Sequence, residues 1–375
     1  MPNKLKIGVS LYVRGADQSF WENGIFQNCI FLVQLLQNID FVESACLLVE
    51  GPASDTDIKK FLTGIDVPYI HVKDGYETLD VVIEMSASLR QDWATSFTNK
   101  GGKIIGMRVG NDYFIDSANT LYDLGCNSIF TNIKYEEIWT LPQYSSSVVD
   151  YYQIGFNAPV HIVPHLWSPY FISKAILENK HWPRYGYKPG KQKWNIGIFE
   201  PNQYPNKTYL TPLLISEYAY SKHPELINRV KLYNSINVRN KPTFKHFRSR
   251  LQLQQDLKLE TLDRAPLPYV IGLGTNVVIS HQIENAQNYL YYEVLWGNYP
   301  LIHNSEILRD FGYYYPGYDA KEGANQFLNS YLNHDKDLIE HSKSNSLLFK
   351  GLSPTCSRNI EAYRNRLIHA LKLPA

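Results

Sequence analysis

One stretch of the chain decides the fold: Ser280-His-Gln-Ile-Glu-Asn-Ala-Gln-Asn-Tyr-Leu-Tyr-Tyr-Glu-Val-Leu-Trp-Gly-Asn-Tyr-Pro300-Leu-Ile-His-Asn304. It follows Val277-Val-Ile279, a short β-branched run that ends in polar residues and predicts a strand. Large apolar groups then recur at helical spacing over residues 289–296, and residues 301–303 predict the next strand. Glu293 is therefore expected on a helix just past the carboxyl end of a strand, where open α/β sheets bind ligands.

Two series of alternating apolar runs and amphipathic stretches surround this segment, and they predict two α/β domains with buried parallel sheets. In residues 1–168, the pattern predicts a helix at 25–36 and strands at 5–11, 46–50, 69–72, 81–84, 103–106, 128–130, 137–140 and 160–163. In residues 194–353, it predicts strands at 194–199, 230–233, 257–260, 277–279 and 301–303, and helices at 209–221, 244–253, 266–273, 289–296 and 320–334.

Pro and Gly residues mark the boundaries of these domains. The polar segment at 169–193 contains His181-Trp-Pro-Arg-Tyr-Gly-Tyr-Lys-Pro-Gly-Lys191, in which Pro and Gly interrupt regular structure and the lysines favour solvent. We interpret it as an interdomain linker. Pro354 interrupts the chain again, so residues 354–375 form a separate tail whose amphipathic pattern predicts a helix at 359–371.

Length and composition limit the classes of protein that need to be considered. A chain of 375 residues exceeds one ordinary core, which favours two domains of roughly 150 to 200 residues. The 37 basic residues nearly balance the 36 acidic ones, so no overall field attracts nucleic acid or anionic membrane. No targeting or membrane-spanning run stands out, and we expect a cytoplasmic protein. The cysteines lie too far apart for a zinc site or a disulfide framework: Cys29, Cys46, Cys126 and Cys356.

The pattern Glu293-x-x-x-Gly297-x-x-Pro300 after a strand resembles the C-terminal donor domain of GT-B glycosyltransferases. Retaining members of that class carry two glutamates eight positions apart, followed by a Gly and a Pro before the next strand. Here Glu284 and Glu293 are nine positions apart, and Gly297 comes four residues after the second glutamate where the class usually has five. Pro300 stands seven residues beyond Glu293, as in the class pattern. The glutamate spacing leaves retaining and inverting chemistry both open.

Nearly the whole chain also resembles a bacterial family known only as domain of unknown function 2827. The likeness lies in Trp21-Glu-Asn-Gly24, Val163-Pro-His-Leu-Trp-Ser-Pro169, Phe199-Glu-Pro-Asn202 with Lys207-Thr208, and Ser280-His-Gln-Ile-Glu-Asn285. Together the resemblances imply an α/β fold of the GT-B type: two Rossmann-like, doubly wound domains facing across a cleft, with the C-terminal helix crossing back to the first domain. They imply an acceptor-side domain at 1–168 and a nucleotide-sugar domain at 194–353.

A sugar-nucleotide donor presents a ribose diol and a diphosphate whose charge must be stabilised as it leaves. In the resembling enzymes the second glutamate, at the first turn of its helix, accepts hydrogen bonds from both ribose hydroxyls, and this implies such a role for Glu293. A basic residue in the loop after the domain's first strand faces the phosphates there, and Lys207 has that place. The alternatives are that Glu293 is a surface residue before a turn and Lys207 a solvated loop lysine.

Further donor contacts are expected from neighbouring loops. Asn202 and Thr208 can supply neutral hydrogen-bond donors near Lys207, while the segment that starts at Glu284 and Asn285 brings backbone N–H groups to the phosphates. Arg264 is a second cationic candidate, with a salt bridge to Asp263 as the alternative.

An inverting enzyme needs a base that deprotonates the acceptor hydroxyl, whereas a retaining one does not. Glu84 ends an otherwise apolar strand, where a carboxylate is costly to bury unless it is paired or used. Asp112 follows the next strand in a glycine-containing loop. Glu22 is a third candidate, although an acidic residue near a helix start also interacts favourably with the helix dipole. His281 could contact the donor phosphate or sugar, or be held structurally by a backbone partner.

No metal site is expected, because Asp55-Thr-Asp57 and Asp335-Lys-Asp337 each lie at the boundary of a predicted helix, where Asp is a favoured cap. The sequence hypothesis is a metal-independent hexosyl or pentosyl transferase that moves a sugar from a nucleotide donor to a glycan or other hydroxyl acceptor, in bacterial surface-glycan synthesis. The nucleotide sugar is its substrate, no cofactor is implied, and the oligomeric state stays open. Two alternatives remain: a GT-B-shaped phosphosugar enzyme, either a nucleotide-sugar epimerase or a phosphoribosyl-donor transferase, and a catalytically idle sugar-binding protein.

Overall fold

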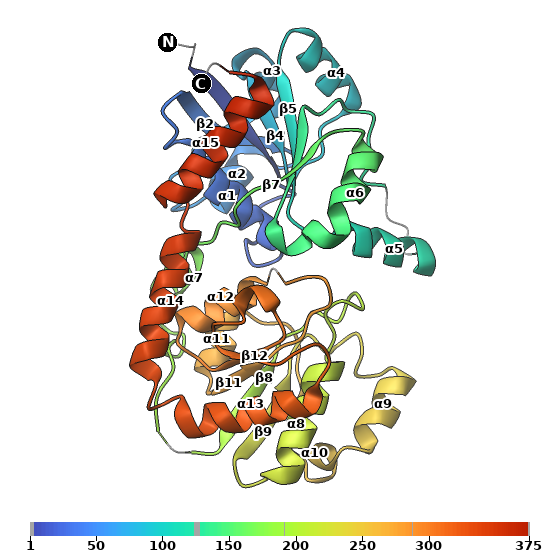
Figure 1. Ribbon diagram of the computed structural model, residues 1–375, viewed down its shortest axis with the longest axis vertical. Coiled ribbons are helices and arrows are strands. Elements are labelled where there is room, and N and C mark those ends of the chain that lie inside the picture. The colour runs from blue at the N-terminus through green and yellow to red at the C-terminus, as the bar shows by residue number, and fades with distance from the viewer. Residues whose placement is uncertain (1–3, 124–127, 191, 287, 374–375) are drawn as a thin grey trace. The chain divides into compact units, whose positions relative to one another are not determined.

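The computed structural model describes residues 4–123, 128–190, 192–286 and 288–373. The chain divides into two compact units, each with its own parallel sheet (Figure 1). Unit 1 comprises Met1–Ser168 and Phe349–Ala375, and unit 2 comprises Pro169–Leu348.

Unit 1 is built on a seven-stranded parallel sheet in the order β3-β2-β1-β4-β5-β6-β7. The chain fills one half outward from β1 and then returns to begin the other half at β4, which is a doubly wound arrangement. The strands are β1 (Leu5–Tyr12), β2 (Val42–Glu50), β3 (Tyr69–His71), β4 (Val81–Glu84), β5 (Lys103–Arg108), β6 (Glu137–Thr140) and β7 (Val160–Ile162). The helices between them are α1 (Gly24–Leu36), α2 (Asp55–Phe61), α3 (Val72–Thr78), α4 (Gln91–Asn99), α5 (Asp112–Tyr122), the 3-10 turn η1 (Pro142–Tyr144) and α6 (Ser145–Phe156).

The C-terminal helix α15 (Ser357–Leu371) packs on unit 1, as the sequence predicted. The Tyr363 hydroxyl donates a hydrogen bond to Pro164 O at 2.8 Å, and its ring packs edge-on against Trp139. Arg366 Nη2 lies 2.7 Å from Glu137 Oε1, so the helix also carries a charge to a buried carboxylate in β6. Apolar packing and an ion pair together hold the tail of the chain on the first sheet.

Unit 2 repeats the same winding with a six-stranded parallel sheet in the order β10-β9-β8-β11-β12-β13. Its strands are β8 (Trp194–Ile198), β9 (Ile227–Leu232), β10 (Leu259–Thr261), β11 (Val277–Ile279), β12 (Leu301–His303) and β13 (Tyr313–Tyr314). Its helices are α7 (Tyr170–Glu178), α8 (Leu210–Lys222), α9 (Pro242–Ser249), α10 (Gln252–Gln255), α11 (Leu267–Gly272), α12 (Tyr289–Trp296), the 3-10 turn η2 (Glu306–Leu308) and α13 (Ala320–Asn333); α14 (Leu338–Leu352) leads back towards the residues of unit 1.

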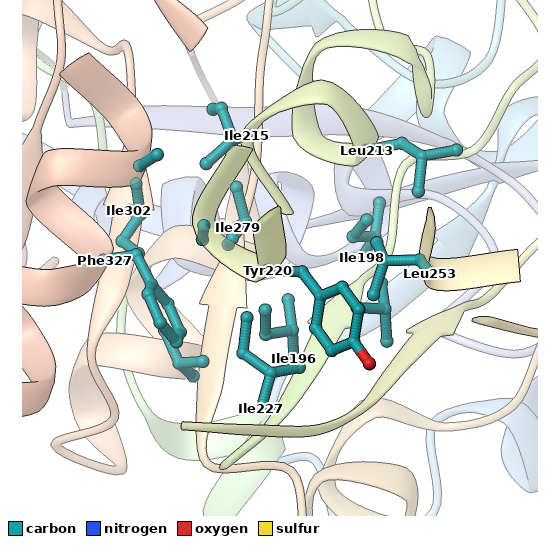
Figure 2. Packing of buried hydrophobic residues seen from close by; sticks show 14 of the residues in the cluster. Ile196, Ile198, Leu213, Ile215, Tyr220, Ile227, Leu253, Ile279, Ile302 and Phe327 are labelled. Atoms are coloured by element: carbon teal, nitrogen blue, oxygen red, sulfur yellow. The ribbon is translucent and has the colours of Figure 1, made fainter. Parts of the chain in front are cut away.

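The core of unit 2 lies between this sheet and the helices α8 and α13 (Figure 2). Ile196 and Ile302 project from the strands towards Phe327 of α13, and none of the three is exposed to solvent. Gly323 allows α13 to approach α8, because a Cβ atom there would lie 2.6 Å from Ile215 Cδ1. The β-branched strand residues are therefore buried under the helices, as the sequence pattern predicted for a covered parallel sheet.

The two doubly wound α/β domains of the GT-B type are confirmed, although several elements differ from the prediction. Residues 128–130 are not a strand: Ser128 Oγ accepts a hydrogen bond from Phe130 N, and the Phe130 ring packs on α6 through Phe156. The apolar run there anchors a loop. Residues 244–253 fall in two helices, α9 and α10, and Leu257, with a left-handed φ of 56°, delays the next strand until Leu259. Helix α7 lies inside the segment that was interpreted as a linker.

Candidate functional site

The strand order of unit 2 reverses between β8 and β11, which are neighbours in the sheet but belong to different halves of the winding. Loops leave the carboxyl ends of these two strands in opposite directions at such a point, and the space between them is where open α/β sheets bind ligands. The loop after β8 and the loop after β11 are joined by a hydrogen bond from Ile283 N to Asn206 O at 2.9 Å. The sequence-predicted donor residues fall mainly in these two loops.

A buried carboxylate occupies this position in the sheet. Glu200, two residues beyond β8, has no solvent exposure. Its Oε1 accepts hydrogen bonds from the Ser280 hydroxyl and, at 3.2 Å, from His281 N, both at the end of β11. Its Oε2 has no hydrogen-bond partner among the residues that the structure describes. Glu200 therefore joins the two loops through one oxygen and leaves the other unsatisfied.

Glu200 and Lys207 lie close enough for the charge of each to affect the pKa of the other. Burial raises the pKa of Glu200 to about 7, against the lowering effects of the Ser280 hydrogen bond, the Lys207 charge and the His281 amide. Burial likewise lowers the pKa of the half-buried Lys207 and outweighs the Glu200 charge, which raises it. Each group is thus held closer to its neutral form than it would be in water, and an added anion would favour the protonated form of both.

His281 is buried in the same network, with 3% of its surface exposed. Its Nδ1 lies 3.0 Å from the Tyr315 hydroxyl, which donates a hydrogen bond to Ser280 O at 3.0 Å. Burial lowers the pKa of His281 to about 4, so the ring is neutral at physiological pH. The network extends to α12, because Ser280 Oγ lies 3.1 Å from the Tyr291 hydroxyl of that helix. The partner of the His281 ring is the Tyr315 side chain and not the backbone group expected from the sequence, while Nε2 has no hydrogen-bond partner in the described part of the chain. Contact with the donor stays a prediction.

Glu293 is the fifth residue of α12, so the expectation that it lies in the first turn of this helix is wrong. Its side chain is buried, with 6% of the residue exposed, and the alternative of a surface residue before a turn is also wrong. Burial raises the pKa of Glu293 to about 8, and no hydrogen bond or charge from a described residue offsets this effect. The Tyr185 hydroxyl donates to the backbone carbonyl of Glu293, which fixes the helix at this turn.

The other predicted donor residues differ in their surroundings. Asn202 adopts a left-handed φ of 55°, and its side chain is occupied by the local backbone: Oδ1 accepts from Tyr209 N at 2.8 Å, and Nδ2 donates to Glu200 O at 2.9 Å. Asn202 therefore shapes the loop. Thr208 is half-buried beside Lys207.

Glu284 and Asn285 lie in the loop after β11. Glu284 is exposed and has a left-handed φ of 46°, while Asn285 N donates to Gln282 Oε1 at 2.6 Å. Arg264 is exposed and follows β10, the edge strand, two strands away from β8 in the sheet. Its neighbour Asp263 pairs with Arg239 at 3.6 Å.

The candidate bases belong to unit 1. Glu84, at the end of β4, is fully buried, and both of its oxygens are occupied: Oε1 accepts from Arg108 at 2.7 Å and from Tyr135 at 2.9 Å, and Oε2 accepts from Leu89 N at 3.0 Å. These contacts favour a structural role, so its assignment as a base stays a prediction that the geometry does not support.

Asp112 and Glu22 are less enclosed. Asp112 is the first residue of α5, half-buried, and its Oδ2 accepts from the Tyr152 hydroxyl at 2.7 Å. Burial raises its pKa, which brings the carboxylate closer to the range of an effective base. Glu22 is exposed and lies before Asn23, the N-cap of α1, so it is outside the first helical turn. It pairs with Arg14 at 3.4 Å. Asp112 is the candidate that the geometry favours.

The two Asp-x-Asp segments have structural partners. Ser54 caps α2, and Asp57 completes the capping box, as expected of Asp at a helix boundary. Asp335 accepts hydrogen bonds from the Tyr187 hydroxyl and Gly190 N at 2.8 and 2.9 Å. In residues 4–123, 128–190, 192–286 and 288–373, no three His, Cys, Asp or Glu side chains gather in a group that could hold a metal ion.

Sequence reasoning did not assign roles to Glu200 or Tyr315. Glu200 was part of the Phe199-Glu-Pro-Asn202 motif, and a carboxylate directly after a buried strand was the available signal. Tyr315 was hidden among three consecutive tyrosines, and only the strand pairing of β13 shows that it reaches His281.

With this geometry established, comparison with known proteins adds a family and a fold. The family model described as protein of unknown function DUF2827 matches residues 7–367. The chain belongs to this family. No curated protein sequence matches it. Membership of DUF2827 carries no reaction in its description, so function has to come from the site and from structural likeness.

Solved structures resemble this DUF2827 member over almost its whole length. A glycosyltransferase from Rickettsia africae superposes with a TM-score of 0.57 at 14% identity, covering 99% of this chain and 100% of the other. Anabaena HepE in complex with UDP-glucose gives 0.55 at 12%, covering 98% and 99%. The pneumococcal O-GlcNAc transferase GtfA, in complex with UDP and GlcNAc, gives 0.58 at 8%, covering 98% and 99%. At these identities the likeness establishes the fold.

No helix within the described ranges of this DUF2827 chain is both long and apolar enough to cross a membrane.

Proposed function

We propose that this protein is a glycosyltransferase that transfers a sugar from a nucleotide-sugar donor to a hydroxyl acceptor. The observation that carries the proposal is a group of three ionisable residues at the point where the strand order of unit 2 reverses: the buried Glu200 and His281 and the half-buried Lys207. Anabaena HepE and pneumococcal GtfA, which share the fold, were each solved with a nucleotide ligand, UDP-glucose in one and UDP with GlcNAc in the other. The shared fold supports the assignment by analogy.

The energetics of the site fit an anionic ligand. A half-buried lysine beside a fully buried carboxylate is costly in the unliganded protein, because burial opposes the charge of each. A diphosphate near Lys207 would stabilise the ammonium ion and favour the protonated, neutral form of Glu200. Glu293, a buried carboxylate whose pKa shift has no offsetting hydrogen bond, is the proposed acceptor for the ribose hydroxyls.

The finer assignment follows the same reasoning. The proposed diphosphate ligands are protein groups, Lys207 and the Thr208 hydroxyl, whereas the backbone N–H of Asn285 is bound to Gln282 Oε1. We therefore propose that transfer needs no bound metal and no separate cofactor. Asp112 of unit 1 is the proposed base if the enzyme inverts. The proposed acceptor is a glycan of the bacterial surface.

A thermal-shift panel tests donor binding, using UDP, GDP, UDP-glucose, UDP-N-acetylglucosamine, GDP-mannose and phosphoribosyl diphosphate. A ligand at about a hundred times its Kd stabilises a protein by roughly 2.7 kcal/mol. We expect a nucleotide sugar to raise the Tm of the wild type, and Lys207→Ala and Glu293→Ala to reduce that rise. Lys222→Ala, at an exposed position near the end of α8, is the control and should respond like the wild type.

Turnover separates the candidate functions. A glycosyltransferase releases nucleoside diphosphate from the bound nucleotide sugar when an acceptor is added, and EDTA should leave this rate unchanged. Conversion of the sugar without release would support an epimerase, and binding without either reaction would support a sugar-binding protein. Absence of any thermal shift across the panel would refute the donor site.

A further inference from the structure

The hydrogen bonds around Tyr315 determine which nitrogen of His281 carries a proton. A tyrosine hydroxyl has one hydrogen, and that of Tyr315 is directed to Ser280 O, a carbonyl oxygen that can only accept. With that hydrogen donated to Ser280 O, the tyrosine oxygen accepts from His281 Nδ1, 3.0 Å away, and this arrangement assigns the proton to Nδ1. Since the buried ring is neutral, Nε2 bears a lone pair and no hydrogen.

Within the described ranges, this Nε2 atom is a buried acceptor without a donor. His281 is 3% exposed, and Nε2 has no hydrogen-bond partner among the described residues. Glu200 Oε2, in the residue that binds the His281 amide, is also buried without a partner there. Buried polar atoms are nearly always satisfied in folded proteins, and exceptions gather where a ligand or water supplies the missing hydrogen bond. Two such atoms at the reversal of the strand order point to a ligand.

An exposed aromatic ring lies against the histidine. The Tyr318 ring is 4.8 Å from the His281 ring at an angle of 49°, yet Tyr318 is 64% exposed. Gly317 precedes it with a left-handed φ of 51°, which turns the chain so that Tyr315 and Tyr318 both contact the imidazole. Tyr318 offers an apolar face of the kind that packs on a sugar ring, next to the unpaired acceptor.

We propose that His281 Nε2 accepts a hydrogen bond from a hydroxyl group of the donor's glycosyl moiety, and that Tyr315 is the positioning residue that holds His281 in the required tautomer. This rests on the proposed function. A phosphate oxygen does not fit, because a lone pair facing an anionic oxygen is repulsive, whereas a sugar hydroxyl supplies the missing hydrogen. Lys207 and the Ser280–His281 turn both lie next to Glu200. A diphosphate bound by Lys207 would therefore leave the glycosyl group, the next group of the donor, beside His281.

Isothermal titration calorimetry on the full chain tests the assignment by comparing a nucleotide sugar with its own nucleoside diphosphate. The probes are UDP-glucose and UDP-N-acetylglucosamine against UDP, and GDP-mannose against GDP. His281→Phe should weaken the sugar nucleotide by about tenfold or more, because a ligand hydroxyl loses its acceptor, while leaving the diphosphate affinity unchanged. His281→Gln places an amide oxygen near the position of Nε2 and should retain most of the affinity.

Tyr315→Phe removes the hydrogen-bond partner of Nδ1 and frees the tautomer. We expect it to weaken nucleotide-sugar binding in part and to change the imidazole ¹⁵N chemical shifts of His281, which a purely structural tyrosine would leave unchanged. This spectrum also tests the tautomer if His281→Phe does not fold.

Three outcomes would overturn the inference: equal losses of diphosphate and nucleotide-sugar affinity in His281→Phe, no loss of either, or a wild-type ¹⁵N spectrum with the proton on Nε2. If none of the probes binds the wild type, the proposed function itself fails and this inference fails with it.

Discussion

Replacing Glu293 with glutamine should stabilise the unliganded protein. The carboxylate is buried in α12, and burial alone raises its pKa to about 8 from 4.5. Between those two pKa values the folded state binds more protons than the unfolded state, so stability falls as pH rises through the window from 4.5 to 8. At pH 7 the Glu293 carboxyl is ionised in the unfolded chain and mostly protonated in the folded one. This difference lowers the free energy of unfolding by about 3 kcal/mol relative to a protein with a neutral, non-titrating group at this position.

Glutamine keeps the size of the side chain and stays neutral. Urea unfolding of the wild type and Glu293→Gln at pH 5 and pH 7.5 measures the difference. We expect the variant to exceed the wild type by about 4 kcal/mol at pH 7.5 and by about 1 kcal/mol at pH 5, while losing nucleotide-sugar affinity. A variant no more stable than the wild type at pH 7.5 would refute the reasoning, because Glu293 would then have a partner that offsets its burial.

Three further substitutions test the packing and electrostatics of each unit by the free energy of unfolding in urea. Arg366→Met should destabilise unit 1 by about 2 kcal/mol, since it removes the guanidinium partner of the buried Glu137, which keeps the Trp139 Nε1 hydrogen bond at 3.0 Å and His161 Nε2 at 3.4 Å. Arg364→Met, which breaks an exposed pair on the same helix, should have a much smaller effect. Phe327→Ala should cost about 3 to 5 kcal/mol by opening a cavity in the core of Figure 2, against about 0.5 kcal/mol or less for the exposed Leu332→Ala; equal effects would contradict the packing. Burial lowers the pKa of His334 to about 4, so between pH 6.5 and pH 4 the unfolded state binds more protons than the folded state. The free energy of unfolding therefore falls by about 1.4 kcal/mol for each unit by which the pH is lowered in this range. In His334→Gln, the loss of stability between pH 7 and pH 5 should be smaller by roughly 2 kcal/mol.

Sequence periodicity predicted most strands and the main helix of the donor-side motif, because buried parallel strands are short runs of apolar residues with a clear beginning and end. Residues 289–296 form α12 and residues 301–303 form β12, as predicted. The prediction of strands was wrong where an apolar side chain packs from a loop or where the backbone conformation interrupts the run. Phe130 looks like a strand residue but packs its ring against α6, and a single left-handed residue, Leu257, moved the start of β10 in a way that local composition does not indicate.

The residues of the candidate site were harder to predict, because their importance comes from contacts between distant segments. Lys207 and His281 are 74 positions apart in the chain, and only the parallel pairing of β8 with β11 brings both to Glu200. The sequence also could not show that Glu84 has a full set of partners, since Arg108 and Tyr135 belong to other segments. Residue type and strand position indicate where a ligand could bind, but the pairing of each polar atom requires the fold.

Glu84 and Glu200 show how this pairing separates structure from function. Both are fully buried carboxylates at the carboxyl end of a strand next to the reversal of strand order, one in each unit. Glu84 uses both oxygens, with a guanidinium group to balance its charge, and nothing remains to be satisfied. Among the described residues, Glu200 has partners for one oxygen only, and beside it His281 Nε2 has none. Since the same sheet geometry satisfies one carboxylate completely, the fold does not impose the unpaired oxygen of the other, and this difference supports the proposal that Glu200 belongs to a ligand site.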